Sequence, residues 1–213
     1  MNIVETFFKD CALDKVAYII DDERITYRQL QKKINQYRSV YKALGISNNV
    51  LILLPESFDF VASILACWSL GIATYHPSVT LPSPTIQSMC ENANTTHIIT
   101  NTELSTKLHV GCKFINIDTL ELYREDKDYS EQDTDKDIFY AITTGSTGAP
   151  KGVMQSNNTW IRSALSSIEL GEIKGGDIAF NCMPLYNSAA WVTSIYPALL
   201  TGTTCAIDTK FSA

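Results

Sequence analysis

Residues 138–152 read IFYAITTGSTGAPKG, and this stretch decides which fold we expect. The apolar run 138–142 predicts a strand that leads directly into a loop with four hydroxyl side chains, two glycines and one lysine in nine positions. Hydroxyls, backbone N–H groups and lysine bind phosphate oxygens, and glycine lets the backbone come close to them. The composition therefore suits a phosphate-binding loop. The alternative is an ordinary surface loop rich in glycine, serine and threonine.

Two common nucleotide loops do not fit this stretch. A Walker-type loop requires Gly-Lys-Ser/Thr, whereas Lys151 follows Pro150 and precedes Gly152. A dinucleotide loop opens a helix with Gly-x-Gly-x-x-Gly, whereas only two residues separate Gly145 from Gly148 and an extended segment follows them. The pattern therefore predicts a loop that connects one strand to another.

Strand-like and helix-like patterns alternate along the whole chain, which predicts an α/β fold with mixed sheets flanked by helices. The expected strands are 16–20 and 24–27 (a hairpin), 50–54, 72–75, 97–99, 138–142, 152–155, 178–182 and 203–207. The expected helices are 27–44 (capped by Thr26), 57–70, 85–92, 156–170 (capped by Ser156) and 189–200.

An acidic stretch divides the sequence. Residues 125–137 hold seven acids and two lysines and almost nothing apolar, which is typical of a solvated linker; an acidic binding segment is the alternative. We expect a first α/β unit at 1–124, a linker at 125–136, and at 137–213 the start of a second unit that carries the loop.

The amino-acid composition is that of an acidic chain with enough apolar residues to form a core. It has a formal charge of −6, a pI of about 5 and no basic patch, so nucleic acid is not an expected partner. Six scattered cysteines without a Cys-x-x-Cys pair suggest reduced core residues in a cytoplasmic protein. No signal peptide is recognised, and the apolar stretch 58–73 is too interrupted to be a membrane span.

The run 140–152 resembles the signature of the adenylate-forming (AMP-binding) enzyme superfamily, which includes acyl-CoA synthetases, nonribosomal peptide adenylation domains and luciferases. Segments 25–30, 57–71 and 183–191 resemble other conserved blocks of that superfamily. The resemblance therefore covers essentially all 213 residues and implies the N-terminal, incomplete part of the adenylate-forming fold.

The resemblance implies a two-step ligase. A carboxylate attacks the α-phosphate of ATP to give an acyl-adenylate, and a thiol, commonly coenzyme A, then takes the acyl group. The implied phosphate-binding residues are Thr143, Thr144, Gly145, Ser146, Thr147, Gly148 and Lys151, with Thr143 on the side of a bound Mg²⁺. For Lys151, a solvated loop lysine is the alternative.

The block 183–191 bears on the class of acid. Amino-acid-activating relatives usually carry an aspartate there, but no acid occurs between Asp177 and Asp208. The form Pro-Leu-Tyr resembles the acyl-CoA synthetase branch, which often has histidine where this chain has Asn187. A small-molecule carboxylic acid, fatty or other, is therefore the expected substrate. Tyr186, Asn187 and Trp191 are the candidate pocket residues, with a core position as the alternative for Trp191.

Members of this superfamily are usually more than twice as long, and the later segments that contact Mg²⁺, the ribose and the reacting carboxylate are not found in this sequence. The catalytic set is therefore incomplete within these 213 residues. We expect the isolated chain to be inactive, to bind ATP weakly and to expose apolar surface. It could be an N-terminal fragment of a ligase, half of a split enzyme completed by a partner chain, or a non-catalytic binding protein.

Overall fold

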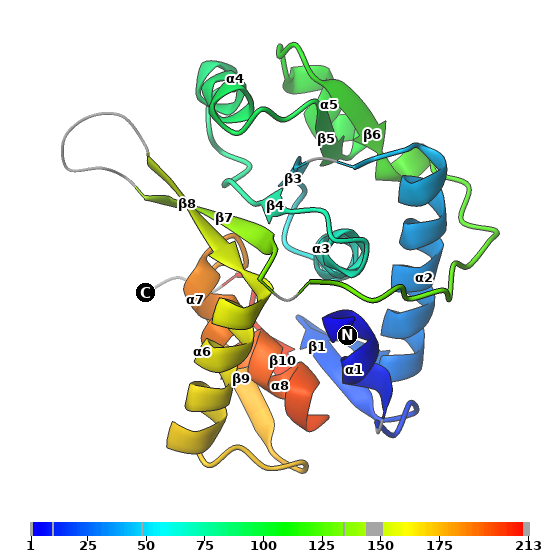
Figure 1. The fold of residues 1–213 in the computed structure, drawn as a ribbon, viewed down its shortest axis with the longest axis vertical. Helices are drawn as coiled ribbons and strands as arrows, with labels where there is room; N and C mark the ends of the chain where they lie inside the picture. The colour runs from blue at the N-terminus through cyan, green and yellow to red at the C-terminus, as the bar shows by residue number, and fades with distance from the viewer. Residues whose placement is uncertain (1, 10, 48, 134, 144–150, 211–213) are drawn as a thin grey trace.

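The computed structural model describes residues 2–9, 11–47, 49–133, 135–143 and 151–210, with residues 141–143 and 151–152 described by their backbone only. The described strands form two sheets (Figure 1). The larger has six strands in the order β6-β5-β3-β4-β7-β8, and the smaller has four in the order β2-β1-β10-β9. The alternation of strand and helix thus gives the α/β fold expected from the sequence.

The larger sheet is mostly parallel. Its strands are β3 (Val50–Leu53), β4 (Thr74–Tyr75), β5 (His97–Thr100), β6 (Lys113–Asn116), β7 (Asp137–Thr143) and β8 (Lys151–Ser156). All neighbouring pairs are parallel except β7 and β8, which are antiparallel. All four residues of β3 are buried, because helices cover both faces of the sheet, and this explains its uninterrupted apolar sequence.

The smaller sheet brings the two ends of the chain together. It contains β1 (Val16–Ile20), β2 (Glu23–Thr26), β9 (Ile178–Asn181) and β10 (Thr204–Ile207). The β1–β2 hairpin is antiparallel, and β10 runs parallel to both β1 and β9. Strands from before and after the acidic stretch therefore share both sheets; whether that stretch marks a domain boundary remains a prediction.

The helices are α1 (Ile3–Lys9), α2 (Tyr27–Ala43), α3 (Phe58–Ser69), α4 (Ser83–Asn92), α5 (Thr102–Lys107), α6 (Asn157–Leu170), α7 (Ser188–Ala190) and α8 (Tyr196–Thr201). A 3₁₀ turn, η1 (Ile117–Thr119), and a π-helical segment, η2 (Trp191–Ile195), complete the described elements. Side chains of Thr26, Ser57 and Ser156 accept hydrogen bonds at the starts of α2, α3 and α6, which confirms two predicted caps and adds a third.

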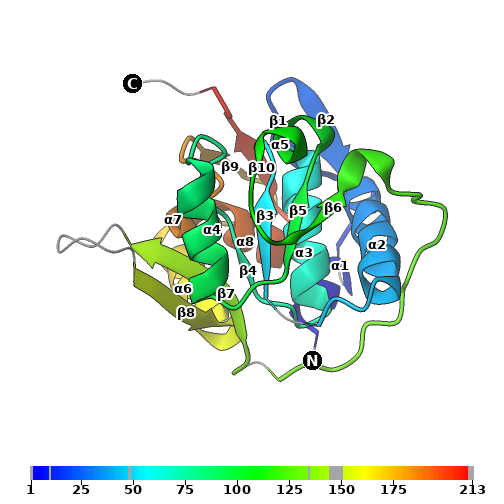
Figure 2. The same ribbon diagram turned by 90° about the horizontal axis from the view of Figure 1, so that it is seen from above.

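The elements stack in alternating layers of helix and sheet. Helices α4 and α5 cover one face of the larger sheet and are seen from above in Figure 2. Helices α1, α3 and α8 lie between the two sheets, with α2 against α3. Along β3, Ile52 belongs to the core between the sheets, and its neighbours Leu51 and Leu53 belong to the core beneath α4. This alternation is the two-residue period of a strand buried on both faces.

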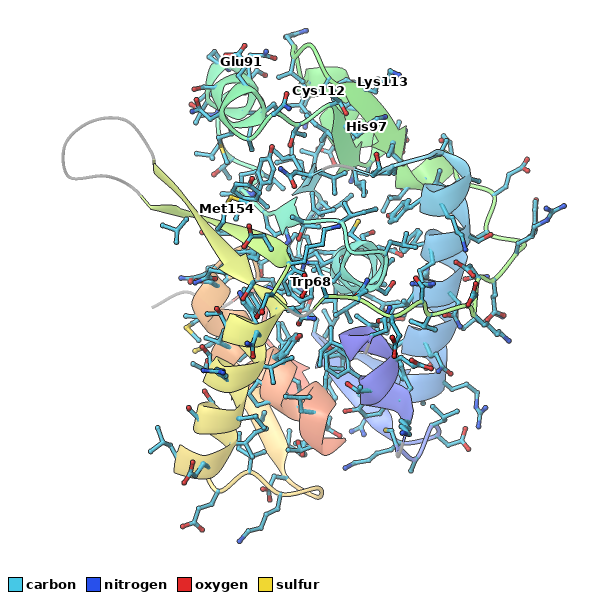
Figure 3. The ribbon with its side chains drawn as sticks, in the orientation of Figure 1. Trp68, Glu91, His97, Cys112, Lys113 and Met154 are labelled. Atoms are coloured by element: carbon cyan, nitrogen blue, oxygen red, sulfur yellow. The ribbon has the colours of Figure 1, made fainter. Side chains whose placement is uncertain are left out.

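Trp68 of α3 lies near the centre of the molecule (Figure 3). Its side chain is fully buried, and its indole N–H donates to Thr74 Oγ1 at 2.8 Å. Its ring contacts Trp160 and Trp191 in edge-to-face geometry, with centroids 5.1 and 4.9 Å away. Trp68 therefore links the helix between the sheets to elements from the second half of the chain.

The acidic stretch is irregular, as expected, but is tied to the helices by Arg38. This guanidinium is 1% exposed and donates to Ser69 Oγ at 2.6 Å, to Asp126 Oδ2 at 3.2 Å and to the Asp128 carbonyl at 2.7 Å. It also lies 4.1 Å from the centroid of the Tyr129 ring. One buried cation thus holds an acidic segment that composition alone describes as solvated.

Replacing Arg38 with methionine is expected to lower the free energy of unfolding by about 3–5 kcal/mol, because the Asp126 carboxylate loses its buried cation and the carbonyls of Ser69, Asp126 and Asp128 lose a donor. Urea denaturation followed by circular dichroism measures the change. Arg28→Met is the matched control, since the Arg28–Asp14 ion pair is largely exposed, and should leave the midpoint unchanged. Equal midpoints for both variants would show that Arg38 does not hold the segment.

Within the described part of the chain, no helix has the length and apolar character needed to cross a membrane. All six cysteines are free thiols, and three of them, Cys67, Cys90 and Cys205, are buried.

Candidate functional site

The predicted phosphate loop follows β7 directly in sequence, at the carboxyl ends of the parallel strands of the larger sheet. Strand β7 pairs in parallel with β4 and ends at Thr143, immediately before the loop. Ligands of α/β sheets commonly bind outside the carboxyl ends of the strands. The ends of β7 and β8 that flank residues 144–150 therefore lie where a ligand site is expected.

Thr143 pairs with Lys151 across β7 and β8, so the two ends of the loop are held together by an antiparallel ladder. This confirms that the loop joins two strands. Thr144, Gly145, Ser146, Thr147 and Gly148 lie outside the described residues, as do the side chains of Thr143 and Lys151. Their phosphate contacts, and the Mg²⁺ contact of Thr143, therefore stay predictions.

A cavity of about 310 Å³ opens beside the end of β4 and beside β7. One part of its wall is formed by residues that come after β4 in sequence, up to and including α4. A second part belongs to β7, and a third is the segment that leads into α7. The lining residues are His76, Pro77, Ser78, Leu81, Met89, Phe139, Tyr140, Tyr186, Asn187 and Ser188. The cavity therefore combines three segments that are distant in sequence, next to the strand that leads into the loop.

Two of the three predicted pocket residues line this cavity. Tyr186 is 40% exposed, and the exposed Asn187 caps α7 by accepting a hydrogen bond from the Ala189 N–H at 2.9 Å. That cap occupies the Asn187 carbonyl oxygen and leaves its amide N–H₂ group available to a ligand. The third residue, Trp191, is fully buried, and its indole N–H donates to the Leu185 carbonyl at 2.7 Å. The structure thus places Trp191 in the core behind the cavity.

His76 is a cavity residue that the sequence did not single out. It is 5% exposed and surrounded by aromatic rings, with the Phe139 centroid at 5.1 Å and the Phe60 centroid at 5.5 Å. Burial lowers the pKa of His76 to about 3, so the ring is neutral at physiological pH. Its position between the apolar residues Tyr75 and Pro77 was the only signal in the sequence.

Hydrogen bonding indicates the tautomer of His76. Its Nε2 lies 2.8 Å from Thr74 Oγ1, and the same oxygen accepts from the Trp68 indole N–H. No other acceptor for the Thr74 hydroxyl is found among the described residues, so this hydroxyl donates to Nε2. The proton of the neutral ring is then on Nδ1, which has no partner in the described part of the chain.

The buried imidazole of His76 predicts that the folded protein loses stability as the pH falls. Because the folded-state pKa of about 3 lies below the unfolded value of about 6.5, the unfolded chain binds a proton between these values and the folded chain does not. The free energy of unfolding should therefore fall by about 1.4 kcal/mol per pH unit below pH 6.5. His76→Asn should flatten this slope, whereas His109→Gln, at an exposed histidine, should not. Urea titrations between pH 7 and 5 measure both, and an unchanged slope in His76→Asn would contradict the assignment.

The described cavity wall has no Asp, Glu, Lys or Arg side chain, and its histidine, His76, is neutral. Glu56, an acid that is not part of the lining, accepts a hydrogen bond from the Leu185 backbone N–H. Burial raises the pKa of Glu56, and the Leu185 N–H partly offsets this. The cavity therefore suits an apolar or neutral group better than a cationic one.

Two kinds of known protein resemble this chain in sequence. The chain is 29% identical over 201 residues to one component of mycosubtilin synthase from Bacillus subtilis, covering 89% of this chain and 7% of that protein. It is 24% identical over 234 residues to the medium/long-chain-fatty-acid–CoA ligase FadD6 of Mycobacterium tuberculosis, covering 99% and 38%.

Among solved structures, apo MatB from Rhodopseudomonas palustris superposes with a TM-score of 0.86 at 16% identity, covering 99% of this chain and 45% of MatB. MatB has also been solved with ATP bound. The chain thus spans less than half the length of each of these proteins. A sequence model described as AMP-binding enzyme matches residues 6–213. By this match over nearly its whole length, the chain belongs to the AMP-binding enzyme family.

Proposed function

We propose that these residues form the N-terminal portion of an ATP-dependent acid–thiol ligase. It activates a carboxylic acid that lacks an amino group and transfers the acyl group to coenzyme A. The observation that carries the proposal is the uncharged cavity next to β7, the strand that leads into the predicted phosphate loop. The six free cysteines favour a reducing, cytoplasmic setting.

The cavity supports an acid without an ammonium group. The family includes relatives of two kinds, represented by a mycosubtilin synthase and by a fatty-acid–CoA ligase. An enzyme that selects an amino acid needs a carboxylate or several acceptors for the substrate amine, because a buried cation must be paired. The described lining instead has no carboxylate and includes the apolar side chains of Leu81, Met89 and Phe139. An alkyl or aryl acid fits this lining.

The proposed reaction has two steps. A carboxylate oxygen of the acid attacks the α-phosphorus of ATP, and the bond from that phosphorus to the leaving pyrophosphate breaks. The thiol then attacks the acyl carbonyl, its proton is lost, and the carbon–oxygen bond to AMP breaks. In this proposal the loop hydroxyls and Lys151 hold the β- and γ-phosphates, which stabilises the charge that develops on pyrophosphate.

Mg²⁺ would supply further charge neutralisation at the phosphates. Within the described residues, no group of three His, Cys, Asp or Glu side chains is clustered for a metal ion. This fits an ion held mainly by the nucleotide phosphates, as is usual for Mg²⁺, with the hydroxyl of Thr143 as the proposed protein ligand.

Exchange of pyrophosphate into ATP tests the proposal with a matched pair of acids, hexanoate and 2-aminohexanoate, which differ by one amino group. We expect the complete enzyme to catalyse exchange with hexanoate or an aryl-substituted acid such as phenylacetate, and at least ten-fold more slowly with each α-amino counterpart. Preference for the amino acid would contradict the proposed substrate class. Absence of exchange with every acid, with or without candidate partner chains, would favour a non-catalytic binding protein.

A further inference from the structure

Two cysteines that are 22 residues apart in sequence lie together in the core beneath α4. Cys90 is in the last turn of α4, and Cys112, which is labelled in Figure 3, lies in the bend just before β6. The apolar cluster between α4 and the larger sheet includes both side chains. Because the two positions are distant in the chain, no cysteine motif in the sequence indicates the pair.

The turn between α4 and β5 connects the two cysteines through Thr95. The Thr95 N–H donates to the carbonyl of Cys90 at 2.8 Å, and the Thr95 carbonyl accepts a hydrogen bond from the Cys112 thiol at 3.5 Å. Burial raises the pKa of Cys90 to about 12, and a hydrogen bond with the Cys112 thiol adds to this shift. The two thiols are therefore neighbours that contact each other.

The other cysteines lie in different parts of the molecule. Cys67 and Cys205 belong to the core between the two sheets, and Cys11 packs against that core. The larger sheet separates this core from the one beneath α4. Cys182 follows β9 in the smaller sheet. The structure therefore brings one pair of thiols into a position where they could be joined.

The two thiols of this pair differ in their access to solvent. Cys90 is 2% exposed, whereas Cys112 is partly exposed. A dissolved oxidant therefore meets Cys112 first. The raised pKa keeps the buried Cys90 thiol protonated and unreactive toward reagents in solution. An accessible cysteine with a second, resolving cysteine beside it is typical of redox-sensitive thiols.

We propose that Cys112 and Cys90 are a redox-sensitive pair that a hydroperoxide converts to a reversible disulfide. With hydrogen peroxide, the Cys112 sulfur attacks one oxygen, the O–O bond breaks, and Cys112 becomes a sulfenic acid as one water is released. The Cys90 sulfur then attacks the Cys112 sulfur, the S–O bond breaks, and the Cys90 proton leaves with the hydroxyl as a second water. The two thiols lose two electrons, which reduce the peroxide.

The disulfide requires a small movement that the local structure permits. An S–S bond is about 2.05 Å long, which is shorter than the contact between two thiols. Cys112 can move toward α4 because residues 108–112, between α5 and β6, contain no helix or strand. The bond would then join β6, at the edge of the sheet, to the helix that contributes Met89 to the cavity wall. The proposal concerns a covalent modification and does not rest on the proposed activity.

Peptide mapping of the complete enzyme after treatment with hydrogen peroxide tests the proposal. Remaining thiols are alkylated, and the chain is digested with trypsin and chymotrypsin. Cleavage after Tyr75 separates Cys90 from Cys67, and cleavage after Lys107 separates Cys90 from Cys112. We expect the peptide that contains Cys90 to be joined to the peptide that contains Cys112, and dithiothreitol to release both. Oxidation of Cys112 to a sulfinic acid, without a link to Cys90, would overturn the proposal.

Three variants test the order of the steps. In Cys90→Ala the sulfenic acid of Cys112 has no resolving thiol, so its labelling by dimedone should increase about ten-fold. Cys112→Ser should leave Cys90 reduced, because the buried thiol is not attacked directly. The matched control is Cys182→Ser, which removes a partly exposed cysteine outside the pair and should leave the link unchanged. Equal dimedone labelling of Cys112 with and without Cys90 would overturn the resolving role of Cys90.

Discussion

Replacing Lys151 with alanine in the complete enzyme is expected to slow acid-dependent exchange of pyrophosphate into ATP by about 100- to 1,000-fold, the usual effect of removing one charge-stabilising donor. The β7–β8 ladder ends at the Thr143–Lys151 pair, so the backbone of Lys151 is held at the exit of the predicted phosphate loop. An ammonium group there would stabilise the pyrophosphate that leaves when the acyl-adenylate forms. Its loss should lower kcat more than the affinity for the acid.

Two further variants, a second loop variant and a control, accompany the Lys151→Ala measurement. Thr144→Ala removes a loop hydroxyl and should also slow exchange, by about ten-fold or more. Lys174→Ala is the matched control, because Lys174 is 79% exposed and lies away from the loop, and its rate should be unchanged. Unchanged exchange in both Lys151→Ala and Thr144→Ala would refute the assigned role of the loop. Equal losses in Lys151→Ala and Lys174→Ala would indicate a general effect of lysine removal.

Replacing Trp68 with alanine is expected to lower the free energy of unfolding by about 3–5 kcal/mol, the cost of deleting a large buried aromatic side chain. Trp68 is fully buried and contacts Trp160, Trp191 and Tyr196, which all follow the acidic stretch in sequence. The cavity left by its side chain would therefore lie where the two halves of the chain pack together. Urea denaturation followed by circular dichroism measures the loss.

Tyr123→Ala is the matched aromatic truncation, since Tyr123 is 86% exposed, and it should change stability by less than about 0.5 kcal/mol. Trp68→Phe keeps an aromatic ring but loses the hydrogen bond to Thr74, so it should have an intermediate effect and remain measurable if the alanine variant does not fold. A loss below about 1 kcal/mol in Trp68→Ala would contradict a central packing role.

Much of the fold was predictable because several elements carry local signals. The Thr26 cap and the apolar period of 27–44 correctly predicted α2, and the continuous apolar run at 50–54 correctly predicted β3. Helix α5 and strand β6 were missed. Helix α5 buries no residue fully, and β6 alternates poorly, so neither leaves a clear periodic pattern.

The expected helix 189–200 is interrupted by the π-helical segment η2. Pro197, in the first turn of α8, has no N–H to donate to the carbonyl of Thr193, so the regular α-helical ladder cannot continue through this point. The sequence predicted helix here because its apolar spacing is helical. The apolar spacing does not show that the N–H group of residue 197 is missing, so it does not reveal the π-helical segment.

The candidate site was predictable only in part. The loop and the block around Tyr186 and Asn187 have local patterns, and the structure brings Tyr186 and Asn187 to one cavity. His76 was missed because its burial arises from packing against Phe139, which is distant in sequence and leaves no local pattern. The pairing of β1 with β10 could not be predicted either, because hydrogen bonds between segments that are distant in sequence produce no local sequence pattern.

Transfer of an ¹⁸O label tests the central claim most directly. The acid that gives the fastest pyrophosphate exchange is labelled in both carboxylate oxygens and incubated with the complete enzyme, ATP, Mg²⁺ and coenzyme A, and the nucleotide products are analysed by mass spectrometry. Attack of the carboxylate on the α-phosphorus predicts AMP carrying one ¹⁸O atom for each acyl-CoA formed. Unlabelled AMP, or ADP with labelled inorganic phosphate, would contradict adenylate formation.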